Sequence, residues 1–332
     1  MRWLSLVVML AASIALADPA GVPVGGPAKL PEATVGSGSG SSAGAYDRLA
    51  DPKAPLKSLT DDPVVGNSPR INGDEVHGVV AFTFDDGPNP ETTPAVIDAL
   101  EKYDIPATFF IVTQRLLGKH GEVPRDILQR ELAAHFMVGS HSVSHKLLKS
   151  AGPDMVAKEM DASFRTLAKE AARPIGMFRP PYGALSGAGR ARLKQLGVTE
   201  VIWSIDTLDW KAHDADKLRK KVLRMILHDN GGVVLMHDVK PITAKIIADV
   251  LDDLEAENCS RLAASPPKEP IWPVSLHYFL RDDKKTSRAI PADVQKRTEA
   301  YKAGLANRCK NRTPVKDDSK PCLANPLAKG CS

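Results

Sequence analysis

The 332-residue sequence lacks several features that would assign it to common classes of protein. Its formal net charge at pH 7 is only +4, too small a surplus to indicate nucleic-acid binding by the whole molecule. Beyond the N-terminus no run is long and apolar enough to cross a membrane, which takes about 20 residues. No heptad repeat is evident, so we expect a monomer. The hydrophobic content of 43% is nevertheless enough for a full core.

Cysteine is scarce, with four residues in the chain: Cys259, Cys309, Cys322 and Cys331. Their spacings are wide and include no Cys-x-x-Cys pair, which argues against a cysteine-ligated zinc site. An even number of cysteines in an exported protein indicates disulfides. The sequence does not choose among the possible pairings.

The first seventeen residues are laid out as a secretory signal peptide. Arg2 precedes an almost wholly apolar stretch over residues 3–12, and residues 15–17 (ALA) form a small-x-small cleavage pattern. The apolar stretch is too short to span a bilayer, which favours cleavage over an uncleaved anchor. The residue directly after the cleavage pattern is not a cysteine, so nothing supports lipid attachment there. We expect an exported protein, in the periplasm, the cell envelope or outside the cell.

Two segments of unusual composition flank the central part of the chain. Residues 18–75 are rich in Pro, Gly and Ser, which favour flexible or extended chain, so we predict a linker. From Arg281 to the C-terminus there are thirteen Lys/Arg against six Asp/Glu, together with three of the four cysteines. We predict that residues 282–332 form a basic extension, with a helix over 293–306 and a disulfide-tied tail. Its charge favours a solvated surface, with weak attraction to anionic envelope polymers as an alternative.

Residues 76–281 alternate between short apolar strands and amphipathic helices. The predicted strands cover residues 79–84, 107–112, 136–138, 176–178, 200–205, 232–236 and 272–280. The predicted helices cover residues 92–102, 125–134, 154–171, 188–196, 215–228 and 240–255. This alternation indicates a parallel sheet with helices outside it. About eight strand positions favour a closed or nearly closed (β/α) barrel, and an open doubly wound sheet is the alternative.

Polar residues follow five of these strands, at the end where a parallel barrel collects functional groups. His141 and His145 are spaced i, i+4, which on a helical turn points both rings the same way. With a carboxylate from Asp86 they form a three-ligand site that leaves a position for water and suits zinc first, then other divalent transition metals. Asp85, His237 and a backbone N–H can supply the base, acid and oxyanion donor that hydrolysis requires.

Each cluster taken alone also has an explanation without function. Paired Asp before Gly-Pro is typical of a turn, and Asp-Trp of a helix cap beside a core aromatic residue. The prediction therefore depends on all five clusters occurring in order, each at a strand end.

Taken together, the clusters resemble the ordered motifs of the polysaccharide deacetylases, the NodB-homology domain or carbohydrate esterase family four. The matching segments are residues 83–87 (TFDDG), 141–145 (HSVSH), 179–183 (RPPYG), 206–210 (DTLDW) and 235–237 (LMH). The resemblance covers roughly residues 76–281. It implies a distorted (β/α) barrel and a divalent metal, commonly zinc, with cobalt, nickel or manganese as alternatives. One departure is Ser140, where many relatives have Asn.

The resemblance implies a role for each residue that matches a motif. Asp86, His141 and His145 are implied to be the metal ligands. Asp85 is implied to be the general base, which takes a proton from metal-bound water. His237 is implied to be the general acid, which protonates the departing amine.

Supporting roles follow from the same resemblance. Arg179 is implied to keep Asp85 ionised, and Asp209 to orient and charge His237. The backbone N–H of Tyr182 is implied to stabilise the oxyanion. The implied apolar walls of the acetate pocket are Trp210, Leu235 and Pro181.

These observations predict an exported, metal-dependent hydrolase that removes N-acetyl groups from a polysaccharide containing N-acetylglucosamine. Peptidoglycan is the favoured substrate because of the export signal, the long predicted tether and the basic tail. Chitin or chito-oligosaccharides and acetylxylan are alternatives. A catalytically silent glycan-binding module is a hypothesis of another class, disfavoured because the implied base, ligands and acid are all present. A hydrolase of small cyclic amides is disfavoured by export and by the intact 179–183 and 206–210 motifs.

Overall fold

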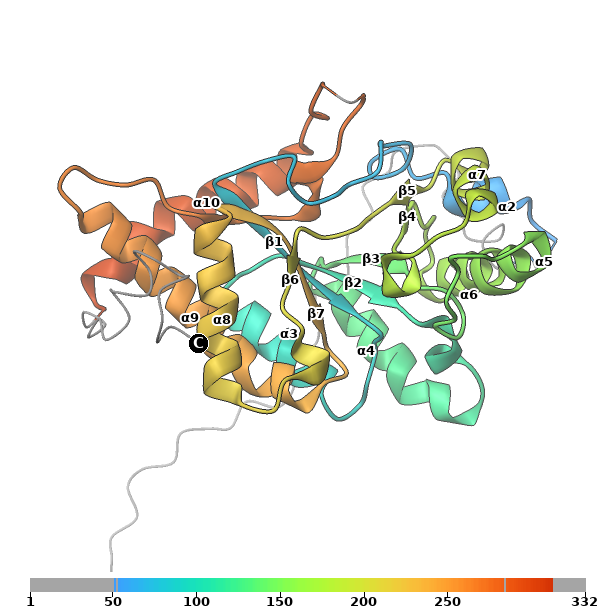
Figure 1. Ribbon diagram of the computed structural model, residues 1–332, viewed down its shortest axis with the longest axis horizontal. Coiled ribbons are helices and arrows are strands. Elements are labelled where there is room, and N and C mark those ends of the chain that lie inside the picture. The colour runs from blue at the N-terminus through green and yellow to red at the C-terminus, as the bar shows by residue number, and fades with distance from the viewer. Residues whose placement is uncertain (1–50, 52, 284, 313–332) are drawn as a thin grey trace, which may run out of the picture. The chain divides into compact units, whose positions relative to one another are not determined.

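A computed structural model describes residues 51, 53–283 and 285–312 (Figure 1). The predicted signal peptide, most of the predicted linker, and Cys322 and Cys331 lie outside the described residues. Within the part of the chain that is described, no helix has the length and apolar character needed to cross a membrane.

The centre of the fold is an eight-stranded parallel sheet that curls into a half-barrel (Figure 1). Its strands run in the order β5-β4-β3-β2-β1-β7-β6, and β8 pairs with the beginning of β1. Among the described residues β5 and β6 do not pair with each other, so the barrel stays incomplete. The predicted distorted (β/α) barrel is confirmed. The strands are β1 Val79–Asp85, β2 Ala107–Ile111, β3 Met137–Ser140, β4 Met177–Phe178, β5 Thr199–Glu200, β6 Ile205–Asp206, β7 Gly231–His237 and β8 Trp272–Pro273.

Helices lie outside the sheet, between successive strands (Figure 1). All six predicted helices are present, although the one predicted over 240–255 continues to Ala263 and the one predicted over 154–171 contains a π turn over Ala157–Asp161. The helices are α2 Leu56–Thr60, α3 Thr93–Lys102, α4 Glu122–Ala133, α5 Pro153–Val156, α6 Ala162–Ala171, α7 Gly187–Leu196, α8 Ala215–His228, α9 Pro241–Ala263 and α10 Ala292–Lys310.

Successive residues of β1 face alternately the core beneath the helices and the inside of the half-barrel. Val80, Phe82 and Phe84 point to one side and join the core beneath the helices. Ala81 points to the other side and joins a smaller apolar cluster inside the half-barrel. Because successive strand residues face opposite sides, Asp85 shares the inner face with Ala81. The same alternation in β7 places Val233 in the inner cluster and Val234 and Met236 in the outer core. His237 therefore also lies on the inner face.

Two predicted strands differ from the observed ones. The strand predicted over 200–205 is divided into β5 and β6, because the chain leaves β4 at one end of the sheet and reaches β7 at the other. Residues 201–204 cross the gap, where Val201 forms a bridge with Ile71 and the Ser204 N–H donates to the Val233 carbonyl. The strand predicted over 272–280 ends after β8, where Pro273 has no N–H for the ladder, and a 3₁₀ turn follows over Leu276–Phe279.

The predicted linker is wrong for its last part. Residues 53–75 include α2, and four of their apolar side chains, Leu56, Leu59, Val65 and Ile71, are buried. The Ile175 N–H also donates to the Leu59 carbonyl, which ties this segment to the residues before β4. The average composition of residues 18–75 concealed this, because the Gly- and Ser-rich run lies before residue 45 and the buried apolar residues after 55.

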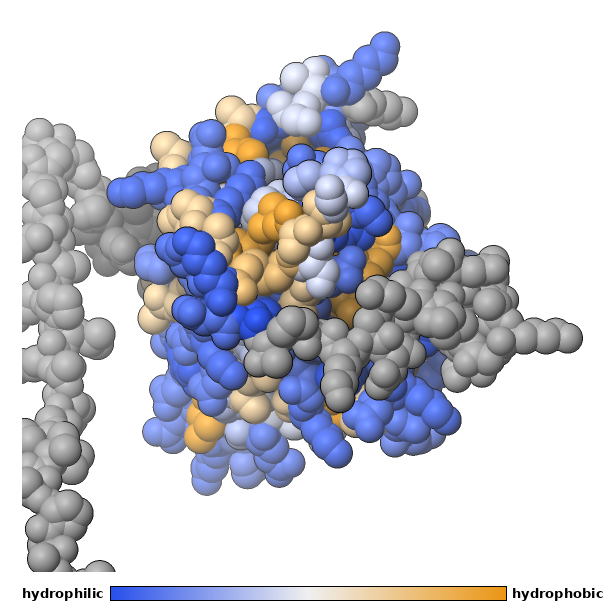
Figure 2. Space-filling view, turned by 90° about the vertical axis from the view of Figure 1, so that its left-hand side faces the viewer, coloured by the Kyte–Doolittle hydropathy of each residue, from blue (hydrophilic) through white to orange (hydrophobic). Residues whose placement is uncertain are grey.

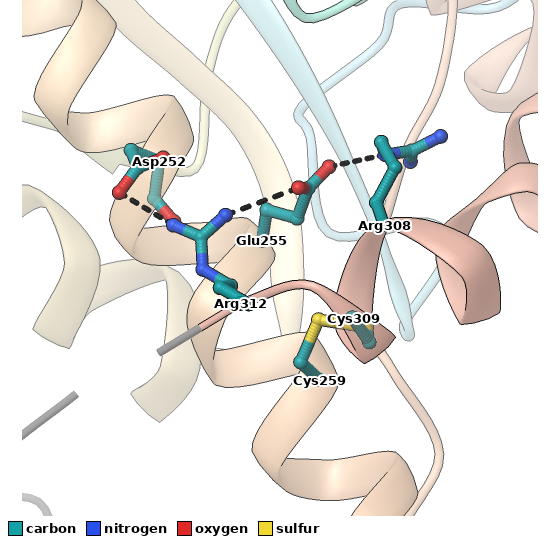
Figure 3. The surroundings of a disulfide bond; sticks show 6 residues. All are labelled: Asp252, Glu255, Cys259, Arg308, Cys309 and Arg312. Atoms are coloured by element: carbon teal, nitrogen blue, oxygen red, sulfur yellow. Dashed lines mark hydrogen bonds and ion pairs between the residues drawn. A yellow bond between two sulfur atoms is a disulfide. The ribbon is translucent and has the colours of Figure 1, made fainter. Parts of the chain in front are cut away.

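The helix predicted over 293–306 is confirmed as α10, and it is fastened to α9 (Figure 3). Cys259 of α9 and Cys309 of α10 form a disulfide. Beside it, the buried Glu255 carboxylate accepts from Arg308 at 2.6 Å and from Arg312 at 3.1 Å. Tyr301 and Leu305 of α10 are buried, so the predicted extension packs on the barrel as far as this helix.

Seen from the left-hand side of Figure 1, the surface is mostly hydrophilic around a smaller apolar area (Figure 2).

The cross-link between α9 and α10 gives a prediction about stability. The pair Cys259→Ser and Cys309→Ser should lower the free energy of unfolding by about 2–4 kcal/mol, because the disulfide closes a 50-residue separation and restricts the unfolded chain. Urea denaturation beside the wild type, without reductant, measures this. Far-UV circular dichroism should be unchanged, since the ion pairs of Glu255 still hold α10. An unchanged free energy of unfolding would contradict a stabilising role for the disulfide.

Candidate active site

The polar residues predicted to converge do so at the carboxyl ends of the central strands. Asp85 ends β1 and lies in register with His237 at the end of β7. His141 follows β3, and Arg179 follows β4. Parallel strands end at one edge, so these side chains share the rim of the half-barrel.

Three of the rim residues are arranged as metal ligands. Ligand atoms of Asp86, His141 and His145 all lie within 4.8 Å of one another. Oδ1 of Asp86 is 3.6 Å from Nε2 of His141 and 3.3 Å from Nε2 of His145. This oxygen is buried and has no hydrogen-bond partner among the described residues. Nδ1 of His141 lies 2.7 Å from the Arg179 carbonyl, which favours a proton on Nδ1 and leaves Nε2 free to bind a cation. The residues fit a divalent metal ion.

The two imidazoles converge for a different reason from the one predicted. Residues 141–145 form a loop instead of a helical turn. Ser142 and His145 both have positive φ angles, 69° and 58°, and the Ser142 hydroxyl accepts the His145 N–H at 3.0 Å. This tight turn brings the ring centroids to 5.0 Å. The structure brings together the two histidines that the i, i+4 spacing indicated, but through a loop and not through a helical turn.

Asp85 is held in a buried ion pair. Its Oδ1 accepts from Nη1 of Arg179 at 2.8 Å, and its Oδ2 is 3.6 Å from Nε2 of His141. Arg179 is fully buried and also donates to the Thr83 hydroxyl at 2.8 Å. Its other donors reach the carbonyls of Val201 and Ile202 in the segment that crosses the gap. Asp85 therefore has one oxygen fixed by a cation and the other turned toward the candidate metal ligands.

His237 has the opposite kind of partner. Its Nδ1 is 2.7 Å from Oδ1 of Asp209, which is buried. The other Asp209 oxygen, Oδ2, accepts from the backbone N–H of His237 and from the Thr243 hydroxyl. Burial by itself would lower the pKa of His237, but the hydrogen bond and charge of Asp209, with smaller contributions from Asp85 and Asp86, raise it to about 9. The imidazole is therefore protonated at neutral pH.

The remaining predicted residues surround the rim less tightly. Tyr182 lies in the turn Pro181–Gly183 with φ 59°, and its ring packs edge-on against His145 at 4.7 Å. Tyr182 is 65% exposed and Trp210 is 53% exposed. Leu235 and Pro181 are buried. The places of Trp210, Leu235 and Pro181 as walls of an acetate pocket stay a prediction.

Some supporting residues were missed in the sequence. Thr243 lies 34 residues from Asp209, and no local pattern links the two. Asp238, the residue after His237, is fully buried and accepts a hydrogen bond from the Thr93 hydroxyl. A side chain at Gly87 would collide with the Asp238 carboxylate, which explains why glycine follows the two Asp residues.

Comparisons with known proteins agree with this geometry. The family model described as polysaccharide deacetylase matches residues 72–201. A chitooligosaccharide deacetylase from Bradyrhizobium is 32% identical over 175 residues, which are 52% of this chain and 77% of the relative. The peptidoglycan-N-acetylglucosamine deacetylase PgdA from Listeria monocytogenes is 31% identical over 222 residues, 67% of this chain and 45% of the relative. The chain thus spans less than half the length of PgdA.

A solved structure shares the fold. The wild-type form of a CE4 family pseudoenzyme from Bacillus anthracis has a TM-score of 0.50 and 21% identity, over 58% of this chain and 66% of the other. At this identity the likeness concerns the fold alone. The family model and the Bradyrhizobium relative lead to one conclusion: the chain belongs to the polysaccharide deacetylase family.

Proposed function

We propose that the protein is a metal-dependent hydrolase that removes N-acetyl groups from a polysaccharide containing N-acetylglucosamine. One observation carries this proposal. A carboxylate paired with a buried cation, Asp85 with Arg179, and an imidazole paired with a buried carboxylate, His237 with Asp209, stand on the same rim as the candidate metal ligands. Amide hydrolysis needs such a base and acid together.

Asp86, His141 and His145 would hold the metal. Two imidazoles and one carboxylate suit zinc first, and cobalt, nickel or manganese accept the same donors. When bound, such an ion polarises a carbonyl and lowers the pKa of a water toward about 7.

The chain's own residues move the protons. Asp85 accepts a proton from the attacking water, and Arg179 fixes the orientation of its carboxylate. The protonated His237 donates to the nitrogen as the C–N bond breaks, which yields acetate and a free amine. The Tyr182 backbone N–H, at the turn beside His145, is proposed to stabilise the negative charge on the carbonyl oxygen.

The proposed substrate is peptidoglycan. The names of relatives support it, since they include peptidoglycan-N-acetylglucosamine and peptidoglycan-N-acetylmuramic acid deacetylases. Chito-oligosaccharides are the alternative, supported by the Bradyrhizobium relative. Acetylxylan is a further alternative, because the same attack cleaves an ester. Export to the periplasm, envelope or medium is proposed from residues 1–17. A silent glycan-binding module is disfavoured because the proposed base, acid and ligands are all present.

The first test is acetate release by the chain beginning at residue 18, with zinc or cobalt added. The substrates are purified peptidoglycan, chitopentaose and acetylxylan. We expect release from peptidoglycan, abolished by a chelator. The Asp85→Asn variant should keep the metal but lose about 10²- to 10⁴-fold in kcat, the usual contribution of a general base.

Asp206→Asn is the control for this variant. Its side chain still accepts the Leu208 N–H, so activity should stay near that of the wild type. Thermal denaturation verifies that Asp85→Asn is folded, because the change leaves Arg179 buried without its carboxylate. An active Asp85→Asn enzyme would refute the base assignment. Release from none of the three substrates by the metal-loaded wild type would favour a binding role.

A second prediction concerns the metal ligands. His141→Ala removes one of three ligands and should lose metal and activity together. His228→Ala, which removes an exposed imidazole paired with Asp229, should lose neither. Metal content after gel filtration, measured by inductively coupled plasma mass spectrometry, distinguishes the variants. Full metal occupancy in His141→Ala would exclude it as a ligand.

A third prediction concerns pH. The folded pKa of His237 is raised to about 9, so the acid form predominates below that pH and is lost above it. The kcat profile should therefore fall as pH rises through about 9. Asp209→Asn removes the charge that raises this pKa, so the alkaline limb should move to lower pH. Profiles of kcat for both enzymes test this, and an unmoved limb in Asp209→Asn would contradict the role of Asp209.

A further inference from the structure

The loop between the two candidate metal histidines is conformationally strained. Ser142 and His145 occupy the left-handed region without being glycine, a backbone conformation that side chains other than glycine rarely adopt. Such a loop persists only where its surroundings fix it. On one side the backbone of Thr113 and Gln114 does so, since their N–H groups donate to the carbonyls of Ser142 and Val143 at 3.1 and 3.0 Å.

On the other side the loop is held by one buried residue, Glu159. Its Oε2 accepts the Ser144 N–H at 2.8 Å, and its Oε1 accepts the Ser144 hydroxyl at 2.6 Å. Its backbone carbonyl accepts the Val143 N–H at 3.0 Å. The ammonium of Lys146 lies 3.6 Å from Oε1. Glu159 thus accepts three hydrogen bonds from the loop: two from Ser144 and one from the Val143 backbone.

The local helix geometry explains how Glu159 reaches the loop. It lies in the π turn Ala157–Asp161 that joins α5 to α6. A π turn widens the helix and displaces its backbone groups from the regular pattern, and such turns recur at functional sites. Here the widened turn presents both the carbonyl and the carboxylate of Glu159 to residues 143–144. The side chain is 4% exposed, so water does not replace these bonds readily.

A second tie runs from the same helix to the start of the loop. The Ser163 hydroxyl donates to the Met160 carbonyl at 2.7 Å and lies 2.6 Å from the Ser140 hydroxyl. Ser140 in turn accepts the Ser142 N–H at 3.3 Å. This pair of serines connects the start of the loop to α6.

We propose that Glu159 is a positioning residue for the metal site, which sets the spacing of His141 and His145 by clamping the strained loop between them. The inference rests on the proposed function in that it assumes a metal at these histidines. The hydrogen bonds and the ion pair of Glu159 go to Val143, Ser144 and Lys146 of the loop and its continuation, so it acts on the histidines through the loop. Residues that orient metal ligands typically contribute about 10- to 100-fold to metal affinity.

The test compares zinc affinity and loop protection in three variants. Glu159→Ala removes the carboxylate, Glu159→Gln keeps an acceptor and a donor for Ser144, and Ser144→Ala removes only the hydroxyl. Zinc affinity is measured by competition with a chromophoric chelator. We expect a loss of about 10-fold or more in Glu159→Ala, a partial loss in Ser144→Ala and recovery toward wild type in Glu159→Gln. Ser144→Ala keeps the test valid should Glu159→Ala fold poorly.

Glu200→Gln is the matched control. Glu200 is also a nearly buried carboxylate in ion pairs, with Arg70 and Arg190, but it lies on β5 away from the loop. It should lose stability without losing zinc affinity. Equal zinc affinity in wild type, Glu159→Ala and Ser144→Ala would overturn the inference, as would an equal loss in Glu200→Gln.

Hydrogen exchange of the metal-free proteins separates this inference from the proposed function. The Ser144 amide should exchange faster in Glu159→Ala than in wild type, whether or not zinc binds, because the variant lacks the carboxylate that accepts it. The Val143 amide donates to the backbone carbonyl of residue 159, which the variant keeps, and serves as the internal reference. If the wild type binds no zinc, the proposed metal site fails, and this exchange measurement alone decides the role of Glu159. Unchanged exchange at the Ser144 amide would then overturn the clamp.

Discussion

The buried ion pair between Arg179 and Asp85 is the interaction on which the rest of the site depends. Taking a guanidinium and a carboxylate out of water costs several kcal/mol per ion, and only good geometry with further hydrogen bonds offsets that cost. Arg179 has those bonds, to Thr83 of β1 and to the carbonyls of Val201 and Ile202. These carbonyls belong to the segment that crosses the open side of the half-barrel. The Arg179 side chain therefore connects the segment that crosses the gap to Asp85, the proposed base. The Val201 and Ile202 carbonyls accept from Arg179 at the point where β5 and β6 do not pair, whereas in a closed barrel they would be available to a neighbouring strand.

The sequence predicted which residues meet at the rim better than it predicted the backbone segments that bring them together. Apolar strands followed by Asp85, His141, Arg179 and His237 were recognisable because a strand's end is marked by a local change of residue type, and parallel strands must end together. Contacts between distant segments carry no such mark. The sequence predicted one strand over 200–205 because its apolar run is nearly continuous. In the structure Val201 and Ile205 are buried, whereas Ile202 and Trp203 in the crossing are half-buried. The i, i+4 spacing of the histidines predicted a helical turn at 141–145, because the interval between residues does not reveal positive φ angles. Packing of residues 53–75 was hidden by averaging composition over a longer segment.

Alternation along the strands explains how one short sheet serves both stability and chemistry. In β1 the large apolar residues Phe82 and Phe84 face the helices, and the residues between them face the interior of the half-barrel. A shift of one residue in register would exchange the two faces and bury the rim carboxylate among the helices. Gly87 limits such a shift, because Asp238 fills the space beside it. The outer core thus sets the position of Asp85 relative to His237 on the neighbouring strand.

The partners of the proposed base and acid have opposite charges, and this decides what each can do at one pH. The Arg179 guanidinium fixes one oxygen of the Asp85 carboxylate and leaves the other turned toward the candidate metal ligands, where it can accept a proton. The buried Asp209 carboxylate raises the pKa of His237 to about 9, so that its imidazole can donate one. A module that only binds glycan needs neither a proton donor nor a proton acceptor, and each buried charge costs stability. The two ion pairs therefore argue for turnover more strongly than the metal ligands do, because a metal site alone serves binding equally well.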